Sequence, residues 1–252
     1  MSITEMEVIL LSMCGRFAMD DRVNEMIVEF VAVGGDSNAW KPDWRPSYNI
    51  RPTDQVPILL ETLADRHDPD SATLRRAELA QWWLAPSFAK ELKSRHPMFN
   101  ARSETAAELV SFRASVKNKR AIVPVSGYYE SKTEGKTKTP HFIHAPEGLL
   151  YFAGLYSWWA DPTKETDDPS RWHLTTTILT RESVGEVAAI HDRTPVTLPV
   201  EAIETWIDPR TTGDQSLVDA MVDAATGVAE TLEFHEIRSP ITGDALEMTQ
   251  PV

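Results

Sequence analysis

The order of strand-like and helix-like segments constrains the fold of this chain most. Short runs rich in β-branched and aromatic residues, bounded by turn formers, predict strands at 56–60, 121–125, 141–143, 150–154 and 173–179. Helices are predicted at 21–30, 104–116, 199–207 and 215–225. These segments do not alternate regularly and carry no glycine-rich phosphate loop, which argues against a Rossmann or P-loop enzyme. The pattern predicts a mixed α+β fold.

Local signals refine this outline. Asp20 precedes the first predicted helix, and Ser103 is expected to cap the second, with Glu104 in its first turn. The linker-like stretches are short and read as loops within one domain: 65–71, 132–139 and 161–170. With 252 residues, of which 42% are hydrophobic, the chain can bury a sizeable core, and we expect a single globular domain.

Charge and cysteine content limit the possible functions. A net charge of −13 argues against a protein that coats duplex DNA by bulk electrostatics, so any nucleic-acid site must be local. Residues 100–140 hold a local excess of Lys and Arg, which is also typical of a solvated helix face. The single cysteine excludes an internal disulfide framework, and Glu5 and Glu7 stand where a signal peptide needs basic residues. We expect a cytoplasmic protein without a membrane segment.

Cys14 stands in Met13-Cys-Gly-Arg-Phe17, so a start at Met13 followed by removal of that methionine would leave a cysteine with a free α-amine. Such a 1,2-aminothiol condenses with an aldehyde, and the thiol then closes a thiazolidine ring. A ring-opened abasic deoxyribose offers this aldehyde. An α-amine with a pKa of about 7.7–8.0 and a thiol of about 8.5 are each partly deprotonated near neutrality. The alternative is a small buried hydrophobic residue.

Three further side chains are candidates for chemistry. Glu130 follows an apolar run and a glycine, where partial desolvation would allow a carboxylate to shuttle protons near neutral pH. His191 precedes a proline-fixed turn and can donate to a sugar hydroxyl, and Asn100 can hold a carbonyl or amine through its amide. The alternatives are a surface glutamate, a structural histidine and an asparagine at the start of a helix.

Aromatic residues and histidines suggest two other kinds of site. Stacking on bases uses exposed aromatic rings, but we expect Trp82 and Trp158 to lie in the core. His141 and His144 are three positions apart on a predicted strand and therefore face opposite sides, without acidic or thiol partners at a metal-ligand spacing. A metal site is rejected on this ground.

Eight short motifs occur in an order that resembles one family. They are Met13-Cys-Gly-Arg-Phe, Tyr48-Asn-Ile-Arg-Pro-Thr, residues 82–88, Asn100-Ala-Arg-Ser-Glu-Thr, Pro124-Val-Ser-Gly-Tyr-Tyr-Glu130, Phe152-Ala-Gly-Leu, Thr177-Ile-Leu-Thr and Ile190-His-Asp-Arg-Thr-Pro. Together they resemble the SOS-response-associated peptidase (SRAP) family over residues 13–206, with an echo in Thr249-Gln-Pro-Val. Each motif is weak alone, and their shared order carries the resemblance.

The resemblance implies an abasic-site sensor that forms a thiazolidine DNA–protein crosslink in single-stranded DNA, with no metal or organic cofactor. It implies one α+β domain around a barrel-like mixed sheet flanked by helices, and we expect a monomer that is nucleoid-associated when bound to DNA. The implied catalytic residues are Cys14, Asn100, Glu130 and His191. The implied DNA contacts are Arg16, Asn49, Pro52, Phe88, Arg102 and Arg193.

Several departures from the family pattern bear on this interpretation. Residues 1–12 would be an N-terminal extension, either a misassigned start or a segment removed by a peptidase-like step, ahead of a domain spanning 13–252. Trp83, Phe88 and Ser131 stand where the family usually has glycine, tryptophan and tryptophan. Two alternative functions are a thiol peptidase using Cys14 and a non-covalent binder of single-stranded or modified DNA. A lyase side activity, strand cleavage by β-elimination from an imine, would use the same residues.

Overall fold

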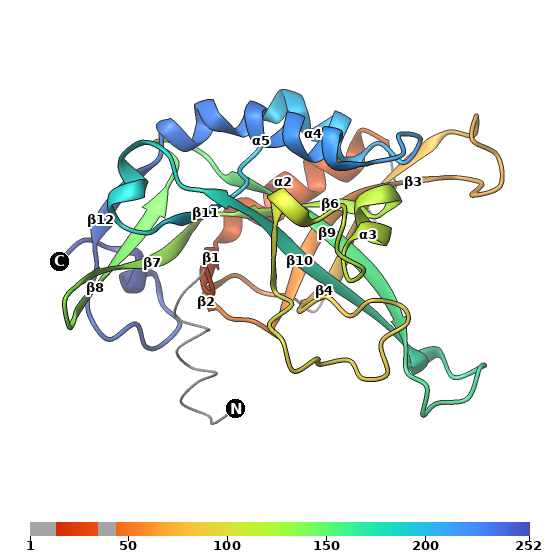
Figure 1. Ribbon diagram of the computed structural model, residues 1–252, viewed down its shortest axis with the longest axis horizontal. Coiled ribbons are helices and arrows are strands. Elements are labelled where there is room, and N and C mark those ends of the chain that lie inside the picture. The colour runs from red at the N-terminus through yellow and green to blue at the C-terminus, as the bar shows by residue number, and fades with distance from the viewer. Residues whose placement is uncertain (1–13, 35–43) are drawn as a thin grey trace.

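The computed structural model describes residues 14–34 and 44–252, whose centre is a closed β-barrel (Figure 1). Its strands pair in the order β10-β4-β3-β6-β9, and β9 pairs again with β10 to close the ring. The barrel strands are β3 (Gln55–Leu63), β4 (Thr73–Trp82), β6 (Arg120–Val125), β9 (Leu150–Ala160) and β10 (Trp172–Glu182). Two short strands, β5 (Asn100–Arg102) and β11 (Arg193–Pro195), pair with β10.

A second, antiparallel sheet runs in the order β12-β8-β7-β1-β2. Its strands are β1 (Phe17–Met19), β2 (Ser47–Ile50), β7 (Gly127–Glu134), β8 (Thr137–His144) and β12 (Glu233–Glu236). The chain passes from the barrel strand β6 into β7 at Gly127, where an added Cβ would lie 2.3 Å from the ring of Phe142. Only glycine fits this close approach, which places β7 and its carboxylate beside β1.

Helices cover the barrel on one side, where α4 (Val200–Ile207) and α5 (Gln215–Glu230) lie near α2 (Asp21–Ala32) in Figure 1. Helix α4 packs on β6 and α2 packs on β4. Trp82 and Trp206 are fully buried, and each indole N–H donates to a backbone carbonyl, as buried tryptophans require. The Asp20 side chain caps α2 by accepting from the Arg22 amide, which confirms the predicted start.

The predicted α+β domain with a barrel-like core flanked by helices is confirmed. All five predicted strands occur, and each is longer than predicted. The helix predicted at 104–116 is wrong. A 3-10 turn at Ser103–Thr105 and a short helix, α3 (Arg113–Asn118), stand there instead. Ser103 makes no side-chain cap, because Arg102 occupies the N-cap position of this turn and Ser103 is its first residue. The Ser103 carbonyl accepts from the Gln215 side-chain amide.

Two other expectations are corrected. Residues 132–139, predicted as a loop, mostly belong to the β7–β8 hairpin, whose turn uses Gly135 at φ +62°. Trp158 is 39% exposed, because neighbouring residues on a strand face opposite sides and Trp159 takes the buried position. The predicted extension at 1–12 lies outside the described residues. Across 14–34 and 44–252, no helix is long and apolar enough to span a bilayer.

Candidate active site

Cys14 lies just before β1, at the junction of the two sheets, and is 1% exposed. Its carbonyl accepts a hydrogen bond of 2.8 Å from Asn100 Nδ2. Strand β1 pairs with β7 in a register that sets Phe17 opposite Tyr128, and the Tyr129 amide donates to the Arg16 carbonyl at 3.0 Å. These contacts fix the backbone from the Cys14 carbonyl into β1.

Glu130 occupies the fourth position of β7 and is 6% exposed, which confirms the expected desolvation. Burial, with a smaller contribution from the nearby charge of Asp192, raises the pKa of its carboxyl from 4.5 to about 8, although a hydrogen bond from the Ser131 backbone opposes the rise. Among the described residues, Glu130 Oε1 has no hydrogen-bond partner. The carboxyl is therefore mostly protonated at neutral pH and has an oxygen available for a ligand.

The thiol of Cys14 differs from the sequence-based expectation. Burial raises its pKa well above the ordinary value, and the charge of Glu130 adds to this effect. The thiol is thus protonated near neutrality rather than partly ionised, because a thiolate in this dry position would lack solvation. Reaction at sulfur therefore requires a base to take the proton.

Asn100 reaches the site from β5, which pairs in parallel with β10 and sets Asn100 beside Ile178. Its side chain is 6% exposed, and its Oδ1 atom lacks a partner among the described residues. Asn100 Oδ1 and Glu130 Oε1 are thus two buried oxygens without partners near one cysteine. Buried polar atoms are normally satisfied, so such a pair indicates a site that binds a donor such as an amine or hydroxyl.

His191 precedes β11 and is oriented by its own turn. His191 Nδ1 lies 3.0 Å from the Arg193 amide nitrogen, and 3.2 Å from both the Arg193 carbonyl and Asp192 Oδ1. Two residues that sequence reasoning missed connect this segment to the site: the hydroxyls of Tyr128 and Thr194 are hydrogen-bonded at 2.7 Å. Tyr128 shares a strand face with Glu130, two positions away, and this spacing was the available sequence signal.

Comparison with known proteins gives the family. The profile described as SOS response associated peptidase (SRAP) matches residues 13–242. The chain belongs to this family. The abasic site processing protein YoqW of Bacillus subtilis is 34% identical over 202 residues, which cover 79% of this chain and 82% of that protein. YoaM of the same organism, also an abasic site processing protein, is 31% identical over 229 residues, which cover 90% of this chain and 92% of that protein.

Solved structures agree with the SRAP fold found here. A crystal structure of a Bacteroides thetaiotaomicron protein superposes with a TM-score of 0.72 at 22% identity, covering 95% of this chain and all of that one. A crystal structure of a phage-related protein from Bordetella bronchiseptica superposes with a TM-score of 0.60 at 26% identity, covering 90% of this chain and 96% of that one. Both comparisons support the same barrel architecture.

The DNA contacts implied by the SRAP resemblance lie in different environments. Arg102 is exposed on β5 and shares a strand face with Asn100. Phe88 is 64% exposed, in the segment between β4 and β5. Pro52 is half-buried in the turn after β2, and Asn49 is buried on β2, where its amide donates to the Gly243 carbonyl. Their roles toward DNA stay predictions.

Arg193 is placed differently from Arg102, the exposed arginine among the implied DNA contacts of this SRAP chain. It is 8% exposed, and its guanidinium donates to both carboxylate oxygens of Glu104, at 2.7 and 3.0 Å, and to the Thr180 carbonyl. This arrangement ties the His191 segment to the turn after Asn100. A phosphate contact by Arg193, which stays a prediction, would compete with Glu104.

The three departures from the family pattern also have defined places. Trp83 is 6% exposed, and the Lys93 ammonium lies 5.1 Å from its ring centroid. Ser131 follows Glu130 on β7 and is half-buried. Within the described ranges, no group of three or more His, Cys, Asp or Glu side chains is arranged to hold a metal ion.

Proposed function

We propose that this chain captures abasic sites in single-stranded DNA covalently, through the α-amine and thiol of Cys14. The observation that carries the proposal is the convergence at Cys14 of a buried, mostly protonated carboxyl, Glu130, and a buried amide, Asn100, each with an unpartnered oxygen. The relatives' shared name, abasic site processing protein, supports abasic DNA as the substrate.

The chemistry proceeds in two balanced steps. The Cys14 amine adds to the C1′ aldehyde of the ring-opened deoxyribose, and loss of one water gives an imine. The imine formed by acid-assisted dehydration is protonated; the thiol adds to its carbon and closes the thiazolidine, the nitrogen keeps its hydrogen, and the thiol proton returns to the group that supplied the proton for dehydration. No oxidant or reductant is needed, and formation of each crosslink releases one water molecule.

Each side chain has a defined task in this proposal. Protonated Glu130 donates to the departing hydroxyl, and the resulting carboxylate then accepts the thiol proton, which a buried thiol cannot release unaided. Asn100 Oδ1 accepts from the amine or sugar hydroxyl and orients it. The His191 imidazole, held by its own turn, donates to the hydroxyl that ring opening releases. The same imine would permit β-elimination and strand cleavage as a side reaction.

The proposal requires that Cys14 be the first residue of the reacting protein, because an upstream peptide bond removes the amine. Protein beginning at Cys14 is mixed with a single-stranded oligonucleotide carrying one abasic site, with an undamaged oligonucleotide as the control. We expect a denaturation-resistant adduct whose mass equals protein plus DNA minus one water. Failure of this protein to form the adduct would overturn the proposal.

A matched comparison separates the aminothiol from its alternatives. Protein retaining residues 1–13 and protein with an acetylated Cys14 amine should both fail to form the stable adduct. A thiol peptidase would instead react with a peptide electrophile irrespective of the amine, and a non-covalent binder would keep full affinity as Cys14→Ala. Among the described residues no hydrogen bond joins Cys14 to His191, which favours the aminothiol over a cysteine–histidine pair.

A further inference from the structure

Two arginines stand opposite each other where β1 and β2 meet. The strands are antiparallel, with Phe17 opposite Ile50, and the residues next to this pair are Arg16 and Arg51. Burial lowers the pKa of the Arg16 guanidinium, and the charge of Arg51 lowers it further, so the two cations lie within electrostatic reach. Like charges directly opposite on neighbouring strands are destabilising. Stabilisation of the sheet therefore does not account for the placement of these two arginines.

Neither cation is neutralised within the described ranges, where no carboxylate lies within 4.0 Å of either guanidinium. Arg16 Nη1 donates to the Ile241 carbonyl at 2.8 Å. Arg51 is exposed, and its Nε donates to Asn49 Oδ1 at 3.3 Å, its one side-chain hydrogen bond to the described residues. Most of its guanidinium N–H groups are free to bind a ligand.

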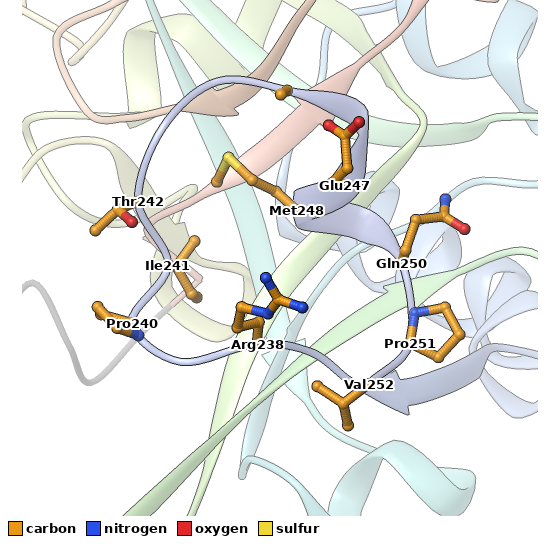
Figure 2. Close-up of a pocket in the computed structure, with 10 residues that line it drawn as sticks. Arg238, Pro240, Ile241, Thr242, Glu247, Met248, Gln250, Pro251 and Val252 are labelled. Atoms are coloured by element: carbon orange, nitrogen blue, oxygen red, sulfur yellow. The ribbon is translucent and has the colours of Figure 1, made fainter.

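The C-terminal loop contacts Arg16 directly and Arg51 through Asn49. Figure 2 shows the loop passing Arg238, turning through Ile241 and Thr242, and returning to Pro251 and Val252. It is closed by a bridge between Ile237 and Pro251. From its turn, the Ile241 and Gly243 carbonyls accept from Arg16 and Asn49, and the Asp244 carboxylate accepts from the Tyr48 amide.

These contacts hold one edge of β2 and the Arg16 side chain in place without neutralising the two guanidiniums. Two neighbouring guanidinium groups can bind one phosphate together, because a phosphate accepts several charge-assisted hydrogen bonds at once. Arg16 is two residues from Cys14, so an anion held here would lie beside the reacting residue.

We infer that Arg16 and Arg51 form a phosphate clamp for one phosphodiester of the DNA strand, adjacent to the captured nucleotide. The Ile241 carbonyl holds the Arg16 guanidinium, and Asn49, itself held by the Gly243 carbonyl, accepts from the Arg51 guanidinium. Arg51 is thus a DNA-binding residue in addition to those implied by family resemblance. This inference rests on the proposed function for the identity of its ligand.

The test measures non-covalent binding of an undamaged single-stranded oligonucleotide over a salt series. Arg51→Gln should weaken binding about tenfold at low salt, as expected for loss of one charge-assisted phosphate contact. It should also reduce the salt slope by about 0.7. The matched control is Arg66→Gln, an equal charge change in the exposed β3–β4 loop, which Figure 1 places away from β2. Arg51→Lys should keep the slope.

A stability measurement separates binding from a structural role. Because Arg51→Gln relieves repulsion, its melting temperature without DNA should equal or exceed that of the parent. A lower melting temperature, an unchanged salt slope, or an equal loss in Arg66→Gln would each overturn the clamp. Undamaged DNA cannot react with Cys14, so these results do not depend on crosslinking. If the parent protein fails to form the crosslink but Arg51→Gln still reduces the salt dependence of DNA binding, only the covalent proposal is refuted.

Discussion

Replacing Glu130 by glutamine should change how the stability of this protein depends on pH. Each tenfold change in proton affinity is worth about 1.4 kcal/mol, so a carboxyl whose pKa is 4.5 when solvated and about 8 when folded couples at most about 5 kcal/mol to protonation. Because the folded state holds the proton more tightly, this stabilisation is complete below pH 4.5. This stabilisation is lost progressively as the pH rises from 4.5 through 8. The Glu130→Gln variant has no titrating carboxyl at this position, so its stability does not show this loss.

The assay is urea unfolding between pH 5 and pH 9, followed by tryptophan fluorescence, to which the fully buried Trp82 and Trp206 contribute. Over this range, the free energy of unfolding of Glu130→Gln should gain about 4 kcal/mol on that of the parent. Glu108→Gln, at an exposed glutamate, controls for loss of one surface carboxyl. A difference between parent and Glu130→Gln that stays constant within about 1 kcal/mol from pH 5 to pH 9 would refute the buried, protonated carboxyl.

Three further predictions follow from the same contacts. The rate of crosslinking by protein beginning at Cys14 should fall above pH about 8 as Glu130 ionises, and Glu130→Gln should be about 100-fold slower without that decline. Glu104→Ala should lower the free energy of unfolding by about 1–3 kcal/mol in urea, because it leaves the buried Arg193 guanidinium without its carboxylate. Tyr128→Phe and Thr194→Val each break one buried hydrogen bond and should each cost about 1 kcal/mol, and their double mutant should cost less than the sum.

The sequence predicts the barrel better than it predicts the site. The long barrel strands are recognisable because their β-branched and aromatic residues are bounded by turn formers, as at 121–125 and 173–179. The strands beside Cys14 and Asn100, β1 and β5, have three residues each, too few for a periodic signal. Their extended form comes from pairing with β7 and β10, residues distant in the chain.

The same distinction applies to individual side chains. Glu130 is predictable as a desolvated carboxylate, since it follows a strongly apolar run and a glycine. The pairing of Arg193 with Glu104 is not, because the two residues are far apart in the chain and their motifs suggest a cation facing DNA. The C-terminal turn that supports Arg16 and Asn49 likewise has no sequence signal, because it acts through backbone carbonyls.

One proton connects the stability of this site to its reactivity. A charged carboxylate at 6% exposure, next to a buried thiol, would be costly, and its neutral form lets β1 and β7 close around Cys14. The same proton is the acid that dehydration of the carbinolamine requires, and its departure creates the base that the thiol requires. The parent should stop losing stability relative to Glu130→Gln near the folded pKa of about 8, and the midpoint at which crosslinking slows should lie at the same pH. Two clearly different pH values would mean that different groups control stability and reaction.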